Sequence, residues 1–202
     1  MTTIEFIGVR GGHGTTTVAL AAAAILTVRG PTLISAHDRP AMCAHVGLAA
    51  DGLPIPLADN LELAAVDEPG DVLDAGTLQS YLDEIPFEGE AATGAQKAAG
   101  CLRIGVLRGP DYLGVRTLCD HAEADLDGLV VISESGRALD ARDVEHVSGC
   151  TVVAVVDHTP VVARTVDAGL FMHRVHRLRE FAQLRAWIDQ VVAVETSCSA
   201  ST

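Results

Sequence analysis

Short apolar runs alternate with longer, helix-patterned stretches along most of this chain. The apolar runs are typical of buried strands, which we predict at residues 4–9, 32–36, 61–66, 102–107, 128–132 and 151–156. Helices are predicted at residues 15–28, 42–48, 113–123, 140–147 and 160–168. Strands that alternate with helices form a parallel sheet covered on both faces, so we expect an α/β, doubly wound fold. Such folds bind ligands at the carboxyl ends of their strands.

The C-terminal part predicts one more helix. Its apolar residues recur at helical spacing: Leu178, Phe181, Leu184, Trp187, Ile188 and Val191. Four arginines lie on or near it: Arg174, Arg177, Arg179 and Arg185. We interpret it as a core-packing helix with a solvated basic face, and contact with DNA or membrane is the less favoured alternative. Residues 195–202 are mostly small and polar and are expected to form a flexible tail.

Residues 51–100 differ in composition from the rest of the chain. They hold eleven acidic residues, several prolines and glycines, and one basic residue, Lys97. We interpret them as an acidic, solvated excursion, part loop and part helix (residues 78–84), within a single domain of residues 1–194. An acidic surface that binds a partner is the alternative.

The composition excludes several classes of protein. The net charge of −13 disfavours binding to DNA or to an anionic membrane surface. No apolar run is long enough to span a bilayer, and the N-terminus has no features of a signal peptide. The five cysteines are scattered without C-x-x-C spacing, which argues against a disulfide scaffold or a zinc site. We therefore expect a cytoplasmic protein with reduced cysteines.

The glycine loop, residues 9–17 (V-R-G-G-H-G-T-T-T), is the most informative motif. It follows a predicted strand and opens a predicted helix, so its amides and the helix N-terminus can surround a phosphate. Threonine hydroxyls there can cap the helix or contact phosphate and magnesium. The candidate nucleotide-binding residues are Arg10, Gly11, Gly12, His13, Gly14, Thr15, Thr16 and Thr17. The alternative is a tight turn capped by threonine, and His13 contacts either phosphate or solvent.

Against the pattern G-x-x-x-x-G-K-[ST], Val9 replaces the first glycine and Thr15 replaces the lysine. The loop nevertheless resembles the deviant Walker A loop of the ParA/MinD superfamily of P-loop ATPases, K-G-G-x-G-K-T-T. It is most similar to the CpaE/TadZ-like branch, whose loops often lack the second lysine. Further similar stretches are residues 33–40, 126–133, 138–144 and 152–170. Of these, residues 126–133 resemble the strand that carries the Walker B aspartate.

The resemblance implies roles for individual residues. Arg10 takes the place of the signature lysine, which reaches the nucleotide of a partner subunit, and Thr16 takes the magnesium-ligand position. Asp157 and Pro160 would lie beside the adenine base. The implied ligand is ATP or ADP with Mg²⁺, with no nucleotide as the alternative, and the implied assembly is a homodimer with protein partners.

The departures from the family concern charge. Thr15, Ser35 and Ser133 stand where the resemblance implies a lysine and two aspartates, and Asp38 is a candidate catalytic substitute. Loss of one donor to the transition state costs on the order of a hundredfold in rate. We therefore expect slow or absent hydrolysis, and whether the chain is an enzyme stays open. Arg108, which directly follows another predicted strand, either lines the site or belongs to a plain turn.

The function implied by the resemblance is that of a spatial organiser. Such a protein marks a pole, a septum or a pilus or secretion assembly site, in the cytoplasm or peripherally at a membrane or pole. A plasmid or chromosome partition ATPase is the first alternative. The second is a pseudo-ATPase scaffold that dimerises without nucleotide.

Overall fold

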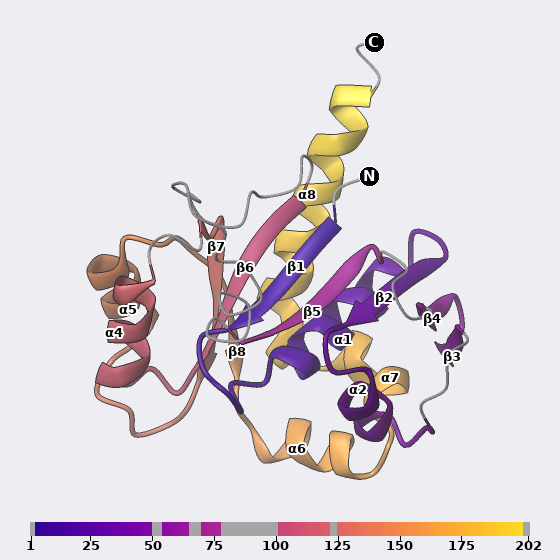
Figure 1. The fold of residues 1–202 in the computed structure, drawn as a ribbon, viewed down its shortest axis with the longest axis horizontal. Helices are drawn as coiled ribbons and strands as arrows, with labels where there is room; N and C mark the ends of the chain where they lie inside the picture. Colours follow the sequence, from indigo (N-terminus) through magenta and orange to yellow (C-terminus); the bar gives the residue numbers. More distant parts are fainter. Residues whose placement is uncertain (1–2, 50–53, 65–69, 78–100, 122–124, 200–202) are drawn as a thin grey trace, which may run out of the picture.

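The computed structural model describes residues 3–49, 54–64, 70–77, 101–121 and 125–199. Within them, eight strands form one sheet in the order β3-β4-β2-β5-β1-β6-β7-β8 (Figure 1). The strands are β1 (Thr3–Gly8), β2 (Thr32–Ala36), β3 (Ile55–Ala58), β4 (Leu61–Leu63), β5 (Val72–Thr77), β6 (Cys101–Arg108), β7 (Gly128–Ser133) and β8 (Val152–Asp157). Neighbouring strands are parallel, except that β3 is antiparallel to β4. The prediction of an α/β, doubly wound, mostly parallel sheet is confirmed.

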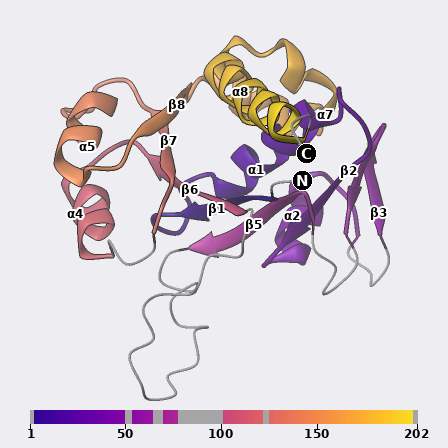
Figure 2. The ribbon, with the colours of Figure 1, turned by 90° about the horizontal axis from the view of Figure 1, so that it is seen from above.

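Helices cover both faces of this sheet. They are α1 (Thr15–Leu26), α2 (Arg39–His45), α4 (Tyr112–Asp120), α5 (Ala141–Ser148), α6 (Pro160–Asp167), α7 (Phe171–Arg174) and α8 (Ala182–Ser199), with 3-10 turns η2 (Val175–Arg177) and η3 (Arg179–Phe181). Figure 2 shows α7 and α8 above one face, with α1 between them and the sheet, and α4 and α5 at the other. The sheet therefore lies between two layers of helices.

Each face of the sheet has its own apolar core. Phe6 of β1 packs into the cluster that contains α1 and α8, whereas the next residue, Ile7, packs into the cluster under α4 and α5. This alternation follows from the two-residue period of a strand. The small side chains of α1 let it lie close to the sheet, and residues 18–25 of that helix are all buried. The start of α1, just after β1, is thereby fixed at the carboxyl edge.

The expectation of a solvated excursion is wrong for part of residues 51–100. β5 lies inside the sheet between β1 and β2, and Val72 is 0% exposed. β3 and β4 pair at the sheet's far edge. β4 falls within the strand predicted at residues 61–66, whereas β3 and β5 were not predicted. The acidic composition of the stretch concealed β5, which is only six residues long and contains an aspartate and a glycine. The predicted helix at residues 78–84 lies outside the described residues.

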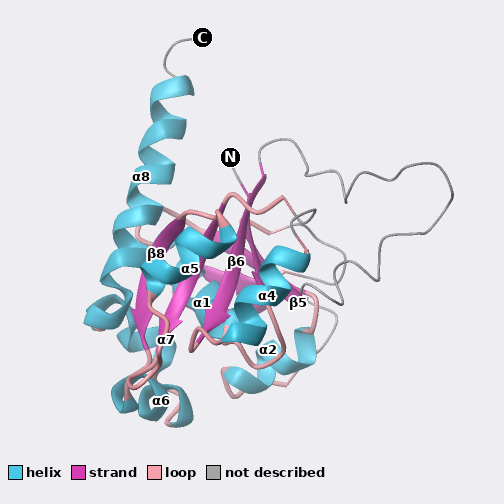
Figure 3. Cartoon of the chain, turned by 90° about the vertical axis from the view of Figure 1, so that its left-hand side faces the viewer, coloured by secondary structure: helices cyan, strands magenta, loops and turns pink. Residues whose placement is uncertain are grey.

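The C-terminal helix begins later than the apolar pattern suggests. Leu178 and Phe181 are buried but precede α8, in the segment of 3-10 turns, while Leu184 and Ile188 pack α8 into the core. The core-packing interpretation is confirmed for this part. α8 continues to Ser199, into the segment expected as a flexible tail, and Figure 3 shows it extending beyond the sheet. Among the described helices, none has the length and apolarity needed to cross a membrane.

Candidate functional site

The glycine loop lies at the carboxyl end of β1 and leads directly into α1. Gly14 is the N-cap residue, with φ of 81°, a left-handed conformation that glycine adopts without strain. A Cβ at this position would lie 2.9 Å from Ile132 Cδ1. Because the N-cap is a glycine, no side chain caps α1, so the threonine cap of the alternative interpretation is not formed. The N-terminus of α1, the end of a helix that favours an anion, thus has no side-chain cap.

Thr16 contacts a carboxylate that the sequence analysis did not assign. Its hydroxyl donates a hydrogen bond of 2.6 Å to Asp74 Oδ2, and Gly76 N–H donates to Asp74 Oδ1 at 3.2 Å. Asp74 lies on β5, opposite Phe6 of β1, and is 6% exposed. Burial raises the pKa of Asp74, and the hydrogen bonds from Thr16 and Gly76 partly oppose this rise. A hydroxyl and a buried carboxylate thus meet beside the glycine loop.

This contact corrects the assignment of the Walker B strand. Ser133 ends β7, which β6 separates from β1, and it lines a different cavity together with Leu139 and Arg142. Residues 126–133 therefore cannot place an acidic side chain at Thr16. β5 does place one there, and its sequence V-L-D-A-G-T contains the one signal available beforehand, an aspartate that follows two apolar residues. The other two expected charge losses, at Thr15 and Ser35, stay predictions.

Asp38 lies near the same carboxylate. It is exposed and follows β2, the neighbour of β5 in the sheet. Its charge contributes to the raised pKa of Asp74, whereas His37 acts in the opposite direction. Asp38 is thus at the edge of the site, and its catalytic role remains a prediction.

His13 occupies the space between the glycine loop, β6 and α4. A Cβ added to Gly114 would lie 3.8 Å from its Cε1 atom. Its Nδ1 atom is buried and has no hydrogen-bond partner among the described residues. Burial lowers the pKa of His13, so the ring is neutral at physiological pH. Its phosphate contact remains a prediction. Arg10, Gly11 and Gly12 are exposed on the outer side of the loop.

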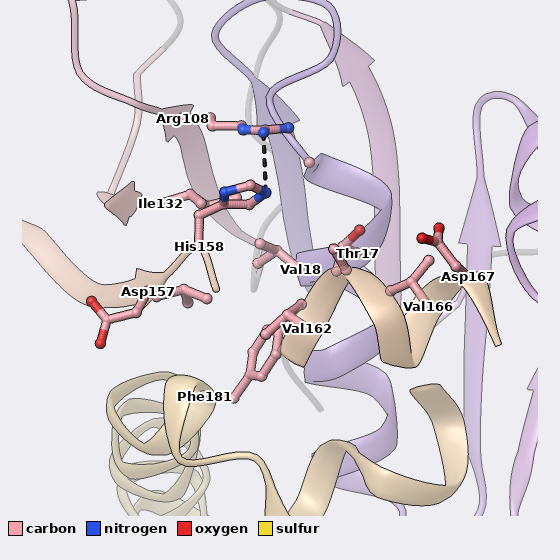
Figure 4. Close-up of a pocket in the computed structure, with 13 residues that line it drawn as sticks. Thr17, Val18, Arg108, Ile132, Asp157, His158, Val162, Val166, Asp167 and Phe181 are labelled. Atoms are coloured by element: carbon pink, nitrogen blue, oxygen red, sulfur yellow. Dashed lines mark hydrogen bonds between the residues drawn. The ribbon is translucent and has the colours of Figure 1, made fainter. Parts of the chain in front are cut away.

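A cavity of about 150 Å³ adjoins the loop (Figure 4). Gly14 and Thr17 line it from the loop side. Apolar side chains from α1, β7, β8, α6 and η3 form most of its wall: Val18, Ile132, Val156, Val162, Val166 and Phe181. A ligand with a phosphate at the loop would extend into this cavity.

Two residues were predicted to lie beside the adenine base, and the structure places only one of them at the cavity. Asp157, at the end of β8, lines it together with Arg108 and His158. Pro160 is exposed and occupies the first turn of α6, where its fixed φ favours helix initiation. The role of Pro160 at the base therefore gains no support from the geometry.

No family model and no curated protein matches the sequence. Solved structures match it over nearly its whole length. A MinC:MinD cell division complex from Aquifex aeolicus matches with a TM-score of 0.68 and 12% identity, over 96% of each chain. A ParA family ATPase from Chlorobium tepidum TLS matches with a TM-score of 0.61 and 10% identity, over 93% of this chain and 98% of that one.

The septum site-determining protein MinD from Pyrococcus horikoshii OT3, in complex with Mg-ADP, matches with a TM-score of 0.61 and 15% identity, over 95% of this chain and 96% of that one. The chain has the ParA/MinD fold. At these identities the likeness shows the fold alone. The function of this chain therefore depends on what the glycine loop, Thr16, Asp74 and the cavity can bind.

Proposed function

We propose that this chain is a ParA/MinD-like protein that binds ATP or ADP with Mg²⁺ at the glycine loop. The observation that carries this proposal is the 2.6 Å hydrogen bond between Thr16 and Asp74 beside the N-terminus of α1. Mg²⁺ prefers oxygen ligands and is held in such sites by one or two protein groups together with phosphates. The hydroxyl, the carboxylate and the uncapped helix N-terminus form that donor set.

Each part of the site has a defined task in this proposal. The loop amides and the first turn of α1 hold the phosphates, as the dipole of a helix favours. Thr16 and Asp74 would hold Mg²⁺, which neutralises phosphate charge when bound. The raised pKa of Asp74 reflects the cost of burying its negative charge, and a cation would offset that cost. The apolar cavity beside Asp157 would take the base.

We further propose that hydrolysis is slow or absent. Thr15 stands where the Walker A loop has a lysine, and Ser35 stands where the resemblance implies an aspartate. Each loss removes a charge that would stabilise the transition state. Asp74 restores the carboxylate needed for Mg²⁺, so binding is less affected than turnover. Phosphate release at saturating ATP should remain far below the median enzyme rate of about 10 s⁻¹.

The proposed role is that of a spatial organiser of the CpaE/TadZ-like kind, acting at a pole, septum or pilus or secretion assembly site. The match to MinD in a complex with MinC supports a function through protein partners. The match to a ParA family ATPase supports the partition alternative. The net charge of −13 weighs against the DNA contact that partition requires. A nucleotide-independent scaffold is supported by the absent lysine.

The test of the binding proposal is the magnesium dependence of nucleotide affinity in Asp74→Asn. Wild type should bind ADP at least tenfold more tightly in Mg²⁺ than in EDTA, because Mg²⁺ links the phosphates to Thr16 and Asp74. Asp74→Asn should reduce that ratio towards one while leaving the affinity in EDTA nearly unchanged. Calorimetry measures both. An unchanged ratio in the variant would show that Asp74 does not hold the cation.

A further inference from the structure

Arg108 brings a positive charge to the phosphate side of the cavity. It ends β6, the neighbour of β1, and lines the same cavity as Gly14 and Thr17. Figure 4 shows its guanidinium directly above the ring of His158. The side chain remains 37% exposed, so a ligand can reach it.

A carboxylate fixes the orientation of this guanidinium without cancelling the local charge. Glu134 Oε1 accepts from Arg108 Nε at 2.8 Å, and Glu134 Oε2 accepts from Arg137 at 2.6 Å. These two arginines lower the pKa of Glu134, so it is ionised at neutral pH. Within this group of three side chains, one negative charge between two guanidinium groups leaves a net charge of one positive unit.

His158 adds orientation and no negative charge. Its Nε2 atom lies 3.1 Å from Arg108 Nη2. Arginine can only donate hydrogen bonds, so in this contact Nε2 of His158 is the acceptor. These contacts use two of the five N–H groups of Arg108, one on Nε and one on Nη2. Among the described residues, no hydrogen-bond acceptor is seen for the other three.

The charge of Arg108 also reaches the glycine loop. Besides burial, the charges of Arg10 and Arg108 contribute to the lowered pKa of His13. Arg108 is therefore close enough to influence a group inside the phosphate-binding motif, although it comes from a strand about a hundred residues away in sequence.

We propose that Arg108 binds a phosphate oxygen of the nucleotide and supplies, from β6, the positive charge that the loop lacks at Thr15. The inference rests on the proposed nucleotide binding. Glu134 and His158 act as positioning residues, since they hold the guanidinium at the cavity. A guanidinium suits this task because it stays charged and can donate two parallel hydrogen bonds to a phosphate.

The test compares Arg108→Gln with Arg137→Gln, using calorimetric titration of ADP and of pyrophosphate. Arg137 shares Glu134 but does not line the cavity, so it is a control matched in charge. Arg108→Gln should weaken both ligands by about tenfold to a hundredfold, the usual effect of losing a charged hydrogen bond. Arg137→Gln should stay within about threefold of wild type, and Arg108→Lys should recover part of the loss by restoring the charge.

Three results would overturn this assignment. Equal affinities of Arg108→Gln and wild type for both ligands would mean that Arg108 contacts neither. A loss for ADP with no loss for pyrophosphate would place Arg108 on the base instead. An equal loss in Arg137→Gln would show a general effect of surface charge. If wild type itself binds neither ligand, the proposed function fails, which is a separate outcome. Thermal unfolding confirms that each variant is folded, and Arg108→Met, which also removes the charge, replaces Arg108→Gln if the latter unfolds.

Discussion

Asp74 carries an electrostatic cost in the candidate site, since burial raises its pKa. Its carboxylate is almost fully buried, and its compensating contacts are the hydroxyl of Thr16 and the N–H of Gly76. Burying a charge without a full set of partners costs stability unless the pKa shifts, and the pKa of Asp74 is raised for that reason. Such a residue is expected where a cation is to be bound.

We expect Asp74→Asn to stabilise the ligand-free protein at pH 7. Because the pKa of Asp74 is raised on folding, the folded state binds more protons than the unfolded state between the two pKa values. Stability therefore falls as pH rises through that window, and the cost persists at neutral pH. Asparagine has no charge to bury and can still bond to Thr16 and Gly76.

Urea unfolding of both proteins between pH 7 and pH 4 measures this effect. The advantage of Asp74→Asn should shrink as the pH is lowered, since wild-type Asp74 becomes protonated. A variant that is less stable than wild type at every pH would refute the electrostatic account of Asp74.

Residues of the loop could be predicted because they are contiguous. Thr16 and Gly14 stand in one motif, whereas Asp74 is 58 residues from Thr16 and meets it only because β5 inserts between β1 and β2. The sequence left two interpretations for Arg108, a residue that lines the site or part of a plain turn. The structure places it at the cavity. The spacing of residues in the sequence does not show which distant side chains come into contact in the fold.

At the scale of elements, α6 forms one part of the cavity wall. Val162 and Val166 of this helix line the cavity, and its N-terminus is held by Thr159. The Thr159 hydroxyl accepts from Val162 N–H and donates to Glu180 Oε1 at 2.8 Å. Glu180 lies in η3 and is buried, so one hydroxyl links the start of α6 to the segment before α8.

Thr159→Ala should lower the free energy of unfolding by about 2 kcal/mol, since it removes an N-cap and the donor to a buried carboxylate. Nucleotide affinity should fall with it, because the cavity wall loosens. Urea unfolding and ADP titration give the two values. Thr165→Val is the matched control, because the Thr165 hydroxyl bonds only to a carbonyl of α6, at Val161, and this variant should change both values little. Equal effects of the two substitutions would contradict the linking role of Thr159.

Most elements were predictable from periodicity, and the exceptions have physical causes. β2 was predicted with its observed bounds, since residues 32–36 (T-L-I-S-A) form a short uncharged run that begins directly after a proline. β5 was missed because its apolar run is interrupted by Asp74 and Gly76, both at the site. The 3-10 turns before α8 were predicted as helix because Leu178 and Phe181 fit its period while belonging to another element.

At the scale of the whole molecule, the site is open on one side. Arg10, Gly11 and Gly12 are exposed at the edge formed by the carboxyl ends of the strands. A second copy of the chain placed against this edge would cover the phosphates, as the resemblance implies. Arg174, Arg177 and Arg179 are also exposed but precede α8, and Arg185 of α8 donates to the carbonyl of His176. The contact with DNA or membrane remains the less favoured alternative.

The most direct test of the central claim is calorimetric titration of ATP and ADP with Mg²⁺, with the mass in each sample measured by light scattering. We predict micromolar binding and a doubling of mass with ATP, and Arg10→Ala should fold normally but remain monomeric. The absence of binding at millimolar nucleotide, with an unchanged mass, would contradict the claim. The fold would then serve as a scaffold whose ligands are proteins.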